Sequence, residues 1–436
     1  MSVSLKPYIG SRDFFPEDMD FRNWMFQVLR DACVSYGYSE YNAPLLESIE
    51  LYRMKSSEEI VNEQLYRFID RGEREVAIRP EMTPTLARMV ASRLKETPRP
   101  FRWFSIANFM RYERPGRGRL REFYQLNVDY LGSGGPAADA ELLMLSMDIL
   151  RAFGAGPEHF SVHYGHRRLL ESYLGDMPEE KKRSVIRLLD KKEKLKPEEF
   201  DALLSQEIPD AGEARRIAAY LEITGEDLPG LAEKGELDGE ATEELILIRK
   251  ILDEQGYGEY LRFDPGIMRG FDYYTGFIFE IFDADPENRR SIFGGGRYDK
   301  LIGLFAKENV PAVGFGLGDV TLRNFIEAHK LTSSLPEERR GIYLTLFNKD
   351  LLAENLKLAS ELRKAGLETE VALEPTKKLG RQFELADKKR RRLALVMGPE
   401  EAKNGVLRIK DLVSGEQSDA ERKDVVSVLT EMLGAS

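Results

Sequence analysis

The sequence predicts an α+β protein with three regions: an antiparallel-sheet domain, a helical insertion that interrupts it, and a C-terminal α/β domain. Alternating, β-rich segments separated by turns predict the sheet. A change to Glu-, Lys- and Leu-rich sequence predicts the insertion, and alternating strand and helix patterns predict the last domain. A length of 436 residues is enough for two to four such domains.

The first region comprises residues 1–168 and 261–330. A helical pattern covers residues 21–36, and Gly37 ends it in the manner of a C-cap. The segments EVAIRP, FRWFSIANFMRYE and FYQLNVDYLG follow, and their alternation predicts antiparallel strands joined by hairpin turns. Apolar residues at helical spacing over residues 137–153 predict a helix that packs on the core.

Two regions of different character complete the chain. Residues 169–260 have apolar residues at helical spacing between turns such as KPEEF and GEDLPG, which predicts an all-helical insertion without a catalytic constellation. After a polar linker, residues 336–436 contain GIYLTLF, a helical segment ended by Gly366, then ETEVAL and RLALVMG. This order predicts a mixed α/β domain of about 100 residues.

Composition limits the compartment and the chemistry. Hydrophobic content of 42% and charged content of 32% are typical of a soluble globular protein, and no segment has the roughly 18 apolar residues needed to span a bilayer. Cys33 is the only cysteine, which excludes a disulfide framework and a thiolate metal site. We therefore expect a cytoplasmic protein with no membrane partner.

The net charge of −11 argues against a broadly basic surface that binds nucleic acid without specificity. One local basic run remains, between residues 377 and 392. Two interpretations stay open for it: a solvated surface, or a contact surface for RNA. The candidate RNA contacts are Lys377, Lys378, Arg381, Lys388, Lys389, Arg390 and Arg391.

Residues 110–125, MRYERPGRGRLREFYQ, have the pattern of a charged hairpin. β-forming residues flank a turn that contains Pro115 and two glycines. Because side chains alternate along a strand, Arg111 and Glu113 share one face. Arginine presents rigid paired donors to phosphate oxygens and keeps its charge. The hairpin is therefore either an exposed charged turn or a phosphate-binding element.

This hairpin closely resembles motif 2 of the class II aminoacyl-tRNA synthetases, in the form found in histidyl-tRNA synthetases. MRGFDYYTGFIFEIF at 268–282 resembles the histidine-specific segment of that family, and SIFGGGRYDKL at 291–301 resembles the glycine-rich strand that follows. RPEMTP at 79–84 resembles the loop that holds the amino acid, and LGRQFELADKKR at 379–390 resembles part of the class IIa anticodon-binding domain. With a weaker match to motif 1, the resemblance covers essentially the whole chain in the family's order.

The resemblance implies a fold, a reaction and a set of partners. The fold is a class II catalytic domain with a helical insertion, followed by an anticodon-binding domain. The reaction is ATP-dependent ligation of L-histidine to tRNA(His) through a histidyl-adenylate, by a homodimer. Mg²⁺ is expected to accompany ATP, with no other cofactor and no metal site of the protein's own.

Residue roles follow from the matched motifs. Arg111 and Arg269 would be the catalytic cations on opposite sides of the ATP α-phosphate. The attacking histidine carboxylate is already ionised and needs no general base, so activation depends on positioning and charge neutralisation. The expected histidine contacts are Glu81, Thr83, Arg111, Gln125, Asp129, Arg269, Tyr273 and Tyr274. The expected ATP contacts are Arg111, Glu113, Arg119, Arg121 and Arg323.

Motif 3 departs from the family pattern. Within residues 313–325, the letters DVT stand where the family has an apolar residue, glutamate and the arginine that binds the γ-phosphate. Thr321 cannot replace a guanidinium. Arg323, about 200° further around a helix, is the first candidate substitute, and Arg297 is the second. Gly116 stands where the bacterial family usually has glutamine, which leaves the reading of the tRNA acceptor end open.

Two other functions fit parts of the pattern. A non-catalytic paralogue that regulates histidine biosynthesis, as a subunit of ATP phosphoribosyltransferase, would explain the altered motif 3. The intact motif 2, the intact RGFDYYTG segment and the C-terminal domain oppose it. A synthetase for another class IIa amino acid is opposed by the paired tyrosines and by Asp129.

Overall fold

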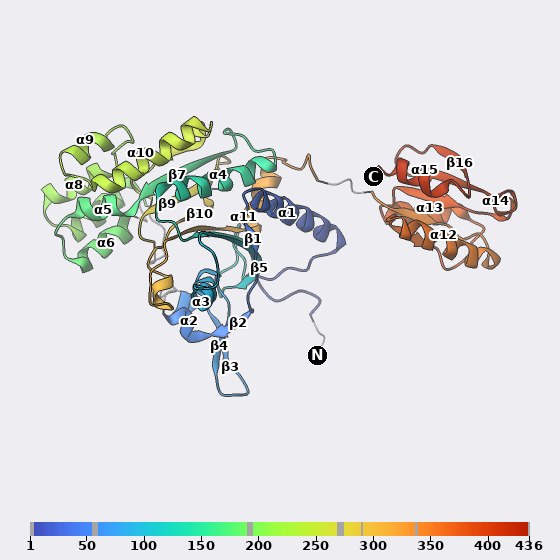
Figure 1. Ribbon diagram of the computed structural model, residues 1–436, viewed down its shortest axis with the longest axis horizontal. Helices are drawn as coiled ribbons and strands as arrows, with labels where there is room; N and C mark the ends of the chain where they lie inside the picture. The colour runs from blue at the N-terminus through green and yellow to red at the C-terminus, as the bar shows by residue number, and fades with distance from the viewer. Residues whose placement is uncertain are drawn as a thin grey trace. The chain divides into compact units, whose positions relative to one another are not determined.

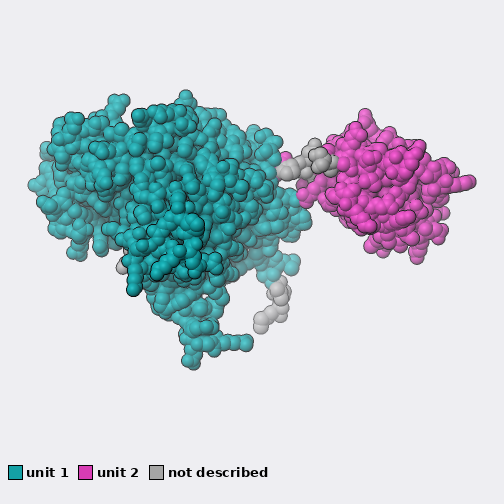
Figure 2. Space-filling model, viewed as in Figure 1, with its two compact units in different colours: residues 1–334 teal, residues 335–436 magenta. Residues whose placement is uncertain are grey.

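The computed structural model describes residues 4–54, 60–189, 195–267, 274–288, 291–335 and 339–434. The chain divides into two compact units, Met1–Ser334 and Leu335–Ser436, which Figure 2 colours separately. Each unit has a sheet of its own, so each is described by itself. None of the described helices is long and apolar enough to cross a membrane.

An eight-stranded sheet forms the centre of the first unit (Figure 1), in the order β1-β5-β6-β11-β10-β9-β7-β8. Its inner strands pair antiparallel, and only the two edge pairs, β1 with β5 and β8 with β7, are parallel. The predicted antiparallel sheet is therefore confirmed. The bounds are β1 Ser39–Glu40, β5 Phe101–Met110, β6 Glu122–Leu131, β7 Phe160–His166, β8 Leu261–Phe263, β9 Phe277–Asp283, β10 Ser291–Arg297 and β11 Ala312–Gly318.

The longest hairpin of this sheet joins β5 to β6. The two strands pair without interruption from Phe101 opposite Leu131 to Met110 opposite Glu122. The connecting loop is itself ordered by two backbone hydrogen bonds between Gly116 and Arg119. Ten paired residues on each side hold this charged loop at one end of the sheet.

Three helices pack against the sheet (Figure 1): α1 (Pro16–Ser35), α4 (Pro136–Ala152) and α11 (Asp319–Ala328). α4 contacts both α1 and β11, and α11 contacts β6, β10 and β11. α1 begins earlier than its apolar pattern predicts, because Pro16 needs no hydrogen-bond partner in the first turn and the acidic residues beside it favour a helix N-terminus. Gly37, with a φ of 77°, follows its end as expected.

A small antiparallel sheet of order β2-β4-β3 leads into a helix and places two of the expected site residues. Glu81 and Thr83 lie where β4 passes into α3. Arg79, just before them, is buried and donates hydrogen bonds to the carbonyl oxygens of Ala43 (2.8 Å) and Asn108 (2.9 Å). This arginine therefore ties the junction to β5. The bounds are β2 Leu46–Ser48, β3 Tyr66–Ile69, β4 Glu75–Ile78, α2 Ile49–Arg53 and α3 Thr83–Arg93.

The chain between β7 and β8 is helical, as its sequence pattern predicts. Apolar side chains on one face of each helix are buried, among them Leu170, Val185 and Leu245. α10 packs on α4, so the helices belong to the same compact unit as the sheet. The bounds are α5 Arg167–Leu174, α6 Glu179–Leu189, α7 Pro197–Glu207, α8 Ala211–Tyr220, α9 Leu228–Glu233 and α10 Gly239–Glu254.

The second unit has a five-stranded sheet of order β13-β12-β14-β15-β16. β12 is parallel to β13 and β14, whereas β14, β15 and β16 pair antiparallel, which confirms the predicted mixed α/β domain. Leu344, Leu358 and Leu395 are among the fully buried core residues. The bounds are β12 Ile342–Leu344, β13 Thr369–Val371, β14 Leu393–Val396, β15 Val406–Asp411, β16 Gln417–Glu421, α12 Leu352–Lys364, α13 Leu379–Lys388, α14 Pro399–Asn404 and α15 Val425–Met432.

Candidate active site

A cavity of about 100 Å³, called here the inner cavity, lies on the central sheet of the first unit. Its walls come from β6, β10 and β11, from the junction before α3, and from the segments that flank β5 and β9. Six of the expected histidine contacts lie together in it. The lining residues are Glu81, Thr83, Arg111, Gln125, Asn127, Asp129, Tyr274, Gly294, Tyr298, Gly314, Phe315 and Gly316.

Strand alternation and facing glycines create this space. Gln125, Asn127 and Asp129 alternate along β6 and therefore share one face. On the neighbouring strand β11, Gly314 lies opposite Asp129 and Gly316 opposite Asn127. A Cβ atom at Gly314 would collide with the Asp129 carboxylate, and one at Gly316 would lie 2.8 Å from the Gln125 amide nitrogen. Only glycine at these two positions leaves room for the polar groups of β6.

Asp129 is the buried acidic group of the inner cavity. It is 4% exposed and accepts a hydrogen bond from the Tyr298 hydroxyl. Burial raises the pKa of Asp129 to about 7, although the Tyr298 hydrogen bond acts to lower this pKa. Sequence reasoning missed Tyr298, whose signal is its place directly after the glycine-rich run and Arg297. The carboxylate is thus poised to change charge near neutral pH.

Arg111 is held in a fixed orientation where the inner cavity meets a second one. Its Nε donates a hydrogen bond to the Pro80 carbonyl oxygen at 2.8 Å, and its guanidinium lies over the Phe123 ring, 5.4 Å from the centroid. The remaining guanidinium nitrogens include Nη1, which lies 4.0 Å from the Glu113 carboxylate. An arginine held in this way presents its charge to both cavities without a large reorganisation.

The second space, called here the outer cavity, has a volume of about 190 Å³. It shares Arg111, Gln125 and Gly316 with the inner cavity. Within it, Arg119 forms an ion pair with Glu113 at 2.9 Å. The lining residues are Arg111, Glu113, Gly118, Arg119, Leu120, Phe123, Gln125, Ser291, Ile292, Phe293, Gly316, Gly318, Val320 and Thr321.

The structure corrects the expectation that Arg121 contacts ATP. Arg121 is not among the residues that line either cavity. Its guanidinium lies 4.1 Å from the ring centroid of Tyr112 and donates hydrogen bonds to the Glu113 carbonyl oxygen and the Tyr8 hydroxyl. The aromatic side chains of the N-terminal segment and of the hairpin therefore draw it away from the cavities.

Both expected substitutes for the motif 3 arginine also require correction. Arg323 forms ion pairs with Asp18 (3.4 Å) and Glu327 (2.8 Å) and lies outside the walls of both cavities. Arg297 is buried in an ion pair with Asp139 at 2.7 Å. Each guanidinium already has a carboxylate partner elsewhere, so neither faces the space where a triphosphate would lie.

Motif 3 instead carries a buried carboxylate with its own counter-charge. Asp319 accepts a hydrogen bond from the Tyr124 backbone N–H at 2.9 Å and pairs with Arg12 of the N-terminal segment at 2.7 Å. Thr321 donates a hydrogen bond to the Ile292 carbonyl oxygen at 2.8 Å. Burial raises the pKa of Asp319 despite the lowering effect of Arg12. These residues fasten motif 3 to β6 and β10 rather than supplying a cation.

A third cavity of about 250 Å³ continues from the outer one, because both are lined by Gly118, Ser291, Ile292 and Thr321. It is lined also by Arg117, which pairs with Glu287 at 2.9 Å. Sequence reasoning did not select Arg117, although it lies in the hairpin loop between the glycines. The arginines that line the outer and third cavities are thus those of motif 2.

Two expected histidine contacts, Arg269 and Tyr273, lie outside the described residues. Tyr274, which follows directly, is 7% exposed and lines the inner cavity.

The basic run of the second unit divides into two groups. Lys389 pairs with Glu370, and Arg391 pairs with Glu368 and, at 2.9 Å, with Glu370. These acidic residues belong to β13 and to the residue before it, so both cations stabilise their own domain. Lys377, Lys378, Arg381 and Lys388 are exposed, and the ion pairs found among the described residues do not include them.

Comparisons with known proteins agree with this geometry. The family model described as histidyl-tRNA synthetase matches residues 10–321, and the model of an anticodon binding domain matches residues 342–432. A histidine–tRNA ligase of Leptospira biflexa is 46% identical over 422 residues, which are 95% of this chain and 95% of that protein. One of Pyrococcus horikoshii is 34% identical and covers 97% of this chain and 98% of its own.

A solved structure has the same fold. The histidyl-tRNA synthetase of Nostoc sp. PCC 7120 is 24% identical, covers 99% of this chain and 100% of its own, and superposes with a TM-score of 0.85. The family model covers well over half of the chain, and the curated relatives match it over nearly its full length. The chain belongs to the histidyl-tRNA synthetase family.

Proposed function

We propose that this chain ligates L-histidine to tRNA(His), with ATP consumed and a histidyl-adenylate as intermediate. The observation that carries the proposal is the joining of two cavities at one fixed arginine. The inner cavity offers polar groups for an amino acid, the outer cavity offers cations for a phosphate chain, and Arg111 lines both.

In the inner cavity, we assign each polar group to a part of histidine. Asp129 and Tyr274, with Tyr273 by family resemblance, would receive the imidazole ring. Glu81, Thr83 and Gln125 would receive the α-ammonium group; Glu81 supplies the negative charge and is 3% exposed. The histidine carboxylate would then point toward Arg111, where the two cavities meet. A site built from hydrogen-bonding groups rejects apolar side chains strongly, because it leaves its own polar groups unpaired.

The reaction requires two anions to meet. A histidine carboxylate oxygen forms a bond to the α-phosphorus of ATP, and the bond from that phosphorus to the bridging oxygen breaks, so that pyrophosphate leaves with its electron pair. Arg111, with Arg269 proposed on the opposite side, would neutralise charge that develops on the α-phosphate oxygens. In the second step the tRNA ribose hydroxyl displaces AMP from the adenylate.

Mg²⁺ fits this site as a companion of ATP. Among the described residues there is no group of three or more His, Cys, Asp or Glu side chains that could hold a metal ion. Glu113, the carboxylate of the outer cavity, already pairs with Arg119. Phosphate oxygens and water would therefore supply most of the ligands, which is the usual arrangement for Mg²⁺ with nucleotides.

Asp129→Asn is expected to raise the KM for histidine about tenfold at pH 8 and to flatten its pH profile. Loss of a charge-assisted hydrogen bond costs about 1.5–3 kcal/mol. The pKa of Asp129 is about 7, so the wild-type carboxylate is ionised above this value and becomes protonated below it. In the wild type, kcat/KM for histidine should therefore decline as pH falls below 7.

The substrate imidazole, with an ordinary pKa of about 6.5, also titrates in this range. The asparagine variant retains that substrate titration and loses the one from the enzyme, so its decline should be shallower. Initial rates of pyrophosphate exchange between pH 5.5 and 8.5 measure both profiles. Parallel profiles for the two proteins would remove Asp129 from imidazole recognition.

Arg119→Ala is expected to raise the KM for ATP about tenfold, whereas Arg323→Ala should change it by less than about twofold. Arg119 lines the outer cavity, and Arg323 is paired with Asp18 and Glu327 outside it. A hydrogen bond to a charged group corresponds to about 1.5–3 kcal/mol, or tenfold and more. ATP-dependence curves at saturating histidine distinguish the two; a larger effect from Arg323→Ala would restore it as the motif 3 substitute.

Three finer features belong to the same proposal. The exposed cations Lys377, Lys378, Arg381 and Lys388 would contact tRNA through the C-terminal domain. The protein would act as a homodimer, as the loose match to motif 1 implies, and in the cytoplasm. The regulatory paralogue is not favoured, because an anticodon binding domain matches residues 342–432 and the motif 2 groups surround a cavity.

Histidine-dependent exchange of labelled pyrophosphate into ATP tests the proposal. Exchange that needs histidine, and that no other amino acid supports, is the expected result. Charging of a tRNA(His) transcript then tests the second step. A protein that binds histidine but neither exchanges pyrophosphate nor charges tRNA would support the regulatory alternative.

A further inference from the structure

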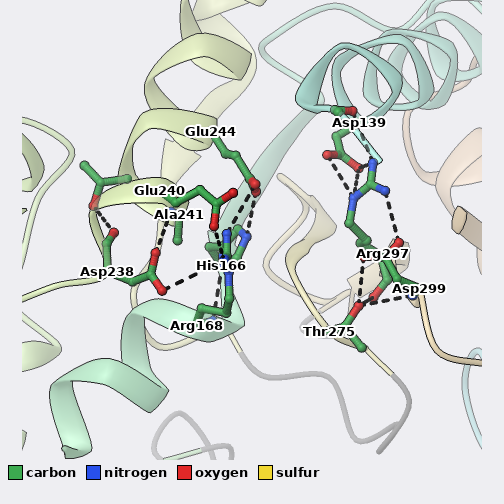
Figure 3. Close-up of polar contacts among 12 residues, drawn as sticks. Asp139, His166, Arg168, Asp238, Glu240, Ala241, Glu244, Thr275, Arg297 and Asp299 are labelled. Atoms are coloured by element: carbon green, nitrogen blue, oxygen red, sulfur yellow. Dashed lines mark hydrogen bonds and ion pairs between the residues drawn. The ribbon is translucent and has the colours of Figure 1, made fainter. Parts of the chain in front are cut away.

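The segment 274–276, just before β9, is gripped from two sides. Tyr274 lines the inner cavity, so the position of its backbone helps to set the shape of the proposed histidine pocket. Figure 3 shows the two groups of polar side chains that surround this region, one around Arg297 and one around His166.

The grip on one side belongs to the central sheet. The Thr275 N–H donates a hydrogen bond to the Arg297 carbonyl oxygen at 2.7 Å, and the Thr275 hydroxyl accepts one from the Asp299 N–H at 3.1 Å. The Arg297 guanidinium is buried against Asp139 of α4, with a shortest distance of 2.7 Å. Arg297 thus has a structural task, which explains why it does not reach the cavities.

The grip on the other side belongs to the helical insertion. Arg167, the first residue of α5, donates a hydrogen bond from Nη1 to the Tyr274 carbonyl oxygen at 3.0 Å. Its backbone N–H donates to the Gly276 carbonyl oxygen, also at 3.0 Å. A Cβ atom at Gly276 would lie 3.4 Å from His166 Nε2 and 3.2 Å from Arg297 Cδ. The segment therefore passes between the insertion and the sheet with little space on either side.

His166 continues this connection into the insertion. Its Nδ1 accepts a hydrogen bond from the Arg168 N–H at 3.2 Å, so the ring hydrogen is on Nε2, which donates to Glu244 of α10 at 3.0 Å. Burial acts to raise the pKa of Glu244, but the hydrogen bond and the nearby positive charges bring this pKa below its ordinary value. Arg168 pairs with Glu240 at 2.7 Å and with Glu244 at 3.2 Å. α5 and α10 are thus locked together beside the segment.

We propose that Arg167 is a positioning residue for histidine binding, through which the helical insertion fixes the backbone of Tyr274. The inference rests on the proposed function, since it assigns histidine to the inner cavity. Arg167 does not line that cavity and would act only through the Tyr274 carbonyl group. Its loss would loosen the wall that meets histidine while leaving the outer cavity, which Tyr274 does not line, unchanged.

The test compares substitutions at two adjacent arginines in the full-length protein. Arg167→Ala is expected to raise the KM for histidine about 10- to 100-fold, the loss of one hydrogen bond from a charged group, with the KM for ATP within about twofold. Arg167→Lys should recover part of the loss, because an ammonium group can also donate to the Tyr274 carbonyl oxygen. Arg168→Ala is the matched control: it removes the same charge, but its side-chain partners are carboxylates of the insertion.

The outcomes separate this inference from the proposed function. A histidine-specific rise for Arg167→Ala, partial recovery by lysine and little change for Arg168→Ala support it. Three results overturn it: an unchanged KM for histidine, equal rises for both substrates, or the same rise for Arg168→Ala. If wild-type protein shows no histidine-dependent exchange, the proposed function fails and this inference fails with it.

Discussion

Arg111→Ala is expected to lower histidine-dependent pyrophosphate exchange by about 10²–10³-fold or more, with little change in thermal stability. Removal of one preorganised donor at a transition-state anion has this effect in other enzymes. Arg111 lines both cavities, so its loss would affect the histidine carboxylate and the α-phosphate together. The KM values of both substrates should rise along with the fall in kcat.

The stability of the variant matters to this result. Arg111 has 19% of its side chain exposed and makes one hydrogen bond to a backbone carbonyl, so its removal leaves no large void. Arg114→Ala is the matched control, because Arg114 is exposed in the same hairpin and lines neither cavity. Wild-type exchange in the Arg111 variant, or an equal loss in the Arg114 variant, would contradict the proposed mechanism.

The sequence was informative where local periodicity decides the structure. The alternation that placed Gln125 and Asp129 on one face of a strand depends only on backbone geometry, and the observed register agrees with it. The glycines of β10 and β11 were recognised as positions of close approach. What a period of two cannot reveal is the partner across the sheet: Tyr298, which binds Asp129, is 169 residues away in sequence.

The arginine assignments show the opposite case. Arg119 and Arg121 are equivalent by composition and lie two residues apart, yet only Arg119 lines the outer cavity. Tyr8, from the N-terminal segment, and Tyr112 decide this difference by binding the Arg121 guanidinium. A long flexible cation goes to whichever partner the fold brings near, and that information is not local.

Motif 3 shows the same dependence on distant segments. As sequence, Asp319 is an acidic residue where an apolar one is expected. In the structure it meets Arg12, 307 residues away, and the pair fastens the N-terminal segment to the start of α11. The departure is therefore a compensated one: it changes how motif 3 is anchored, and it leaves the positive charge of the outer cavity to Arg111 and Arg119.

Replacement of Lys377, Lys378, Arg381 and Lys388 by glutamine is expected to weaken tRNA binding strongly and to reduce its salt dependence. Each contact to a single-strand phosphate contributes about 0.7 to the slope of log affinity against log salt. Four contacts would change the slope by about 3, and at 0.1 M salt the affinity would fall by up to roughly 10³-fold. Pyrophosphate exchange should be unchanged, because these residues belong to a separate compact unit from both cavities.

The control for this prediction is in the same basic run. Lys389 and Arg391 are spent on Glu368 and Glu370 of their own domain, so their replacement by glutamine should lower the stability of that domain more than it lowers tRNA affinity. Binding titrations at several salt concentrations, on both full-length variants, compare exposed and paired cations of one surface. If the run is only a solvated face, the first variant keeps the wild-type affinity and slope. If the charge of the surface matters regardless of pairing, both variants lose affinity in proportion to the charge removed. A loss confined to the first variant is the result that assigns tRNA contact to the unpaired cations, and it depends on an ion-pair pattern that the sequence alone does not reveal.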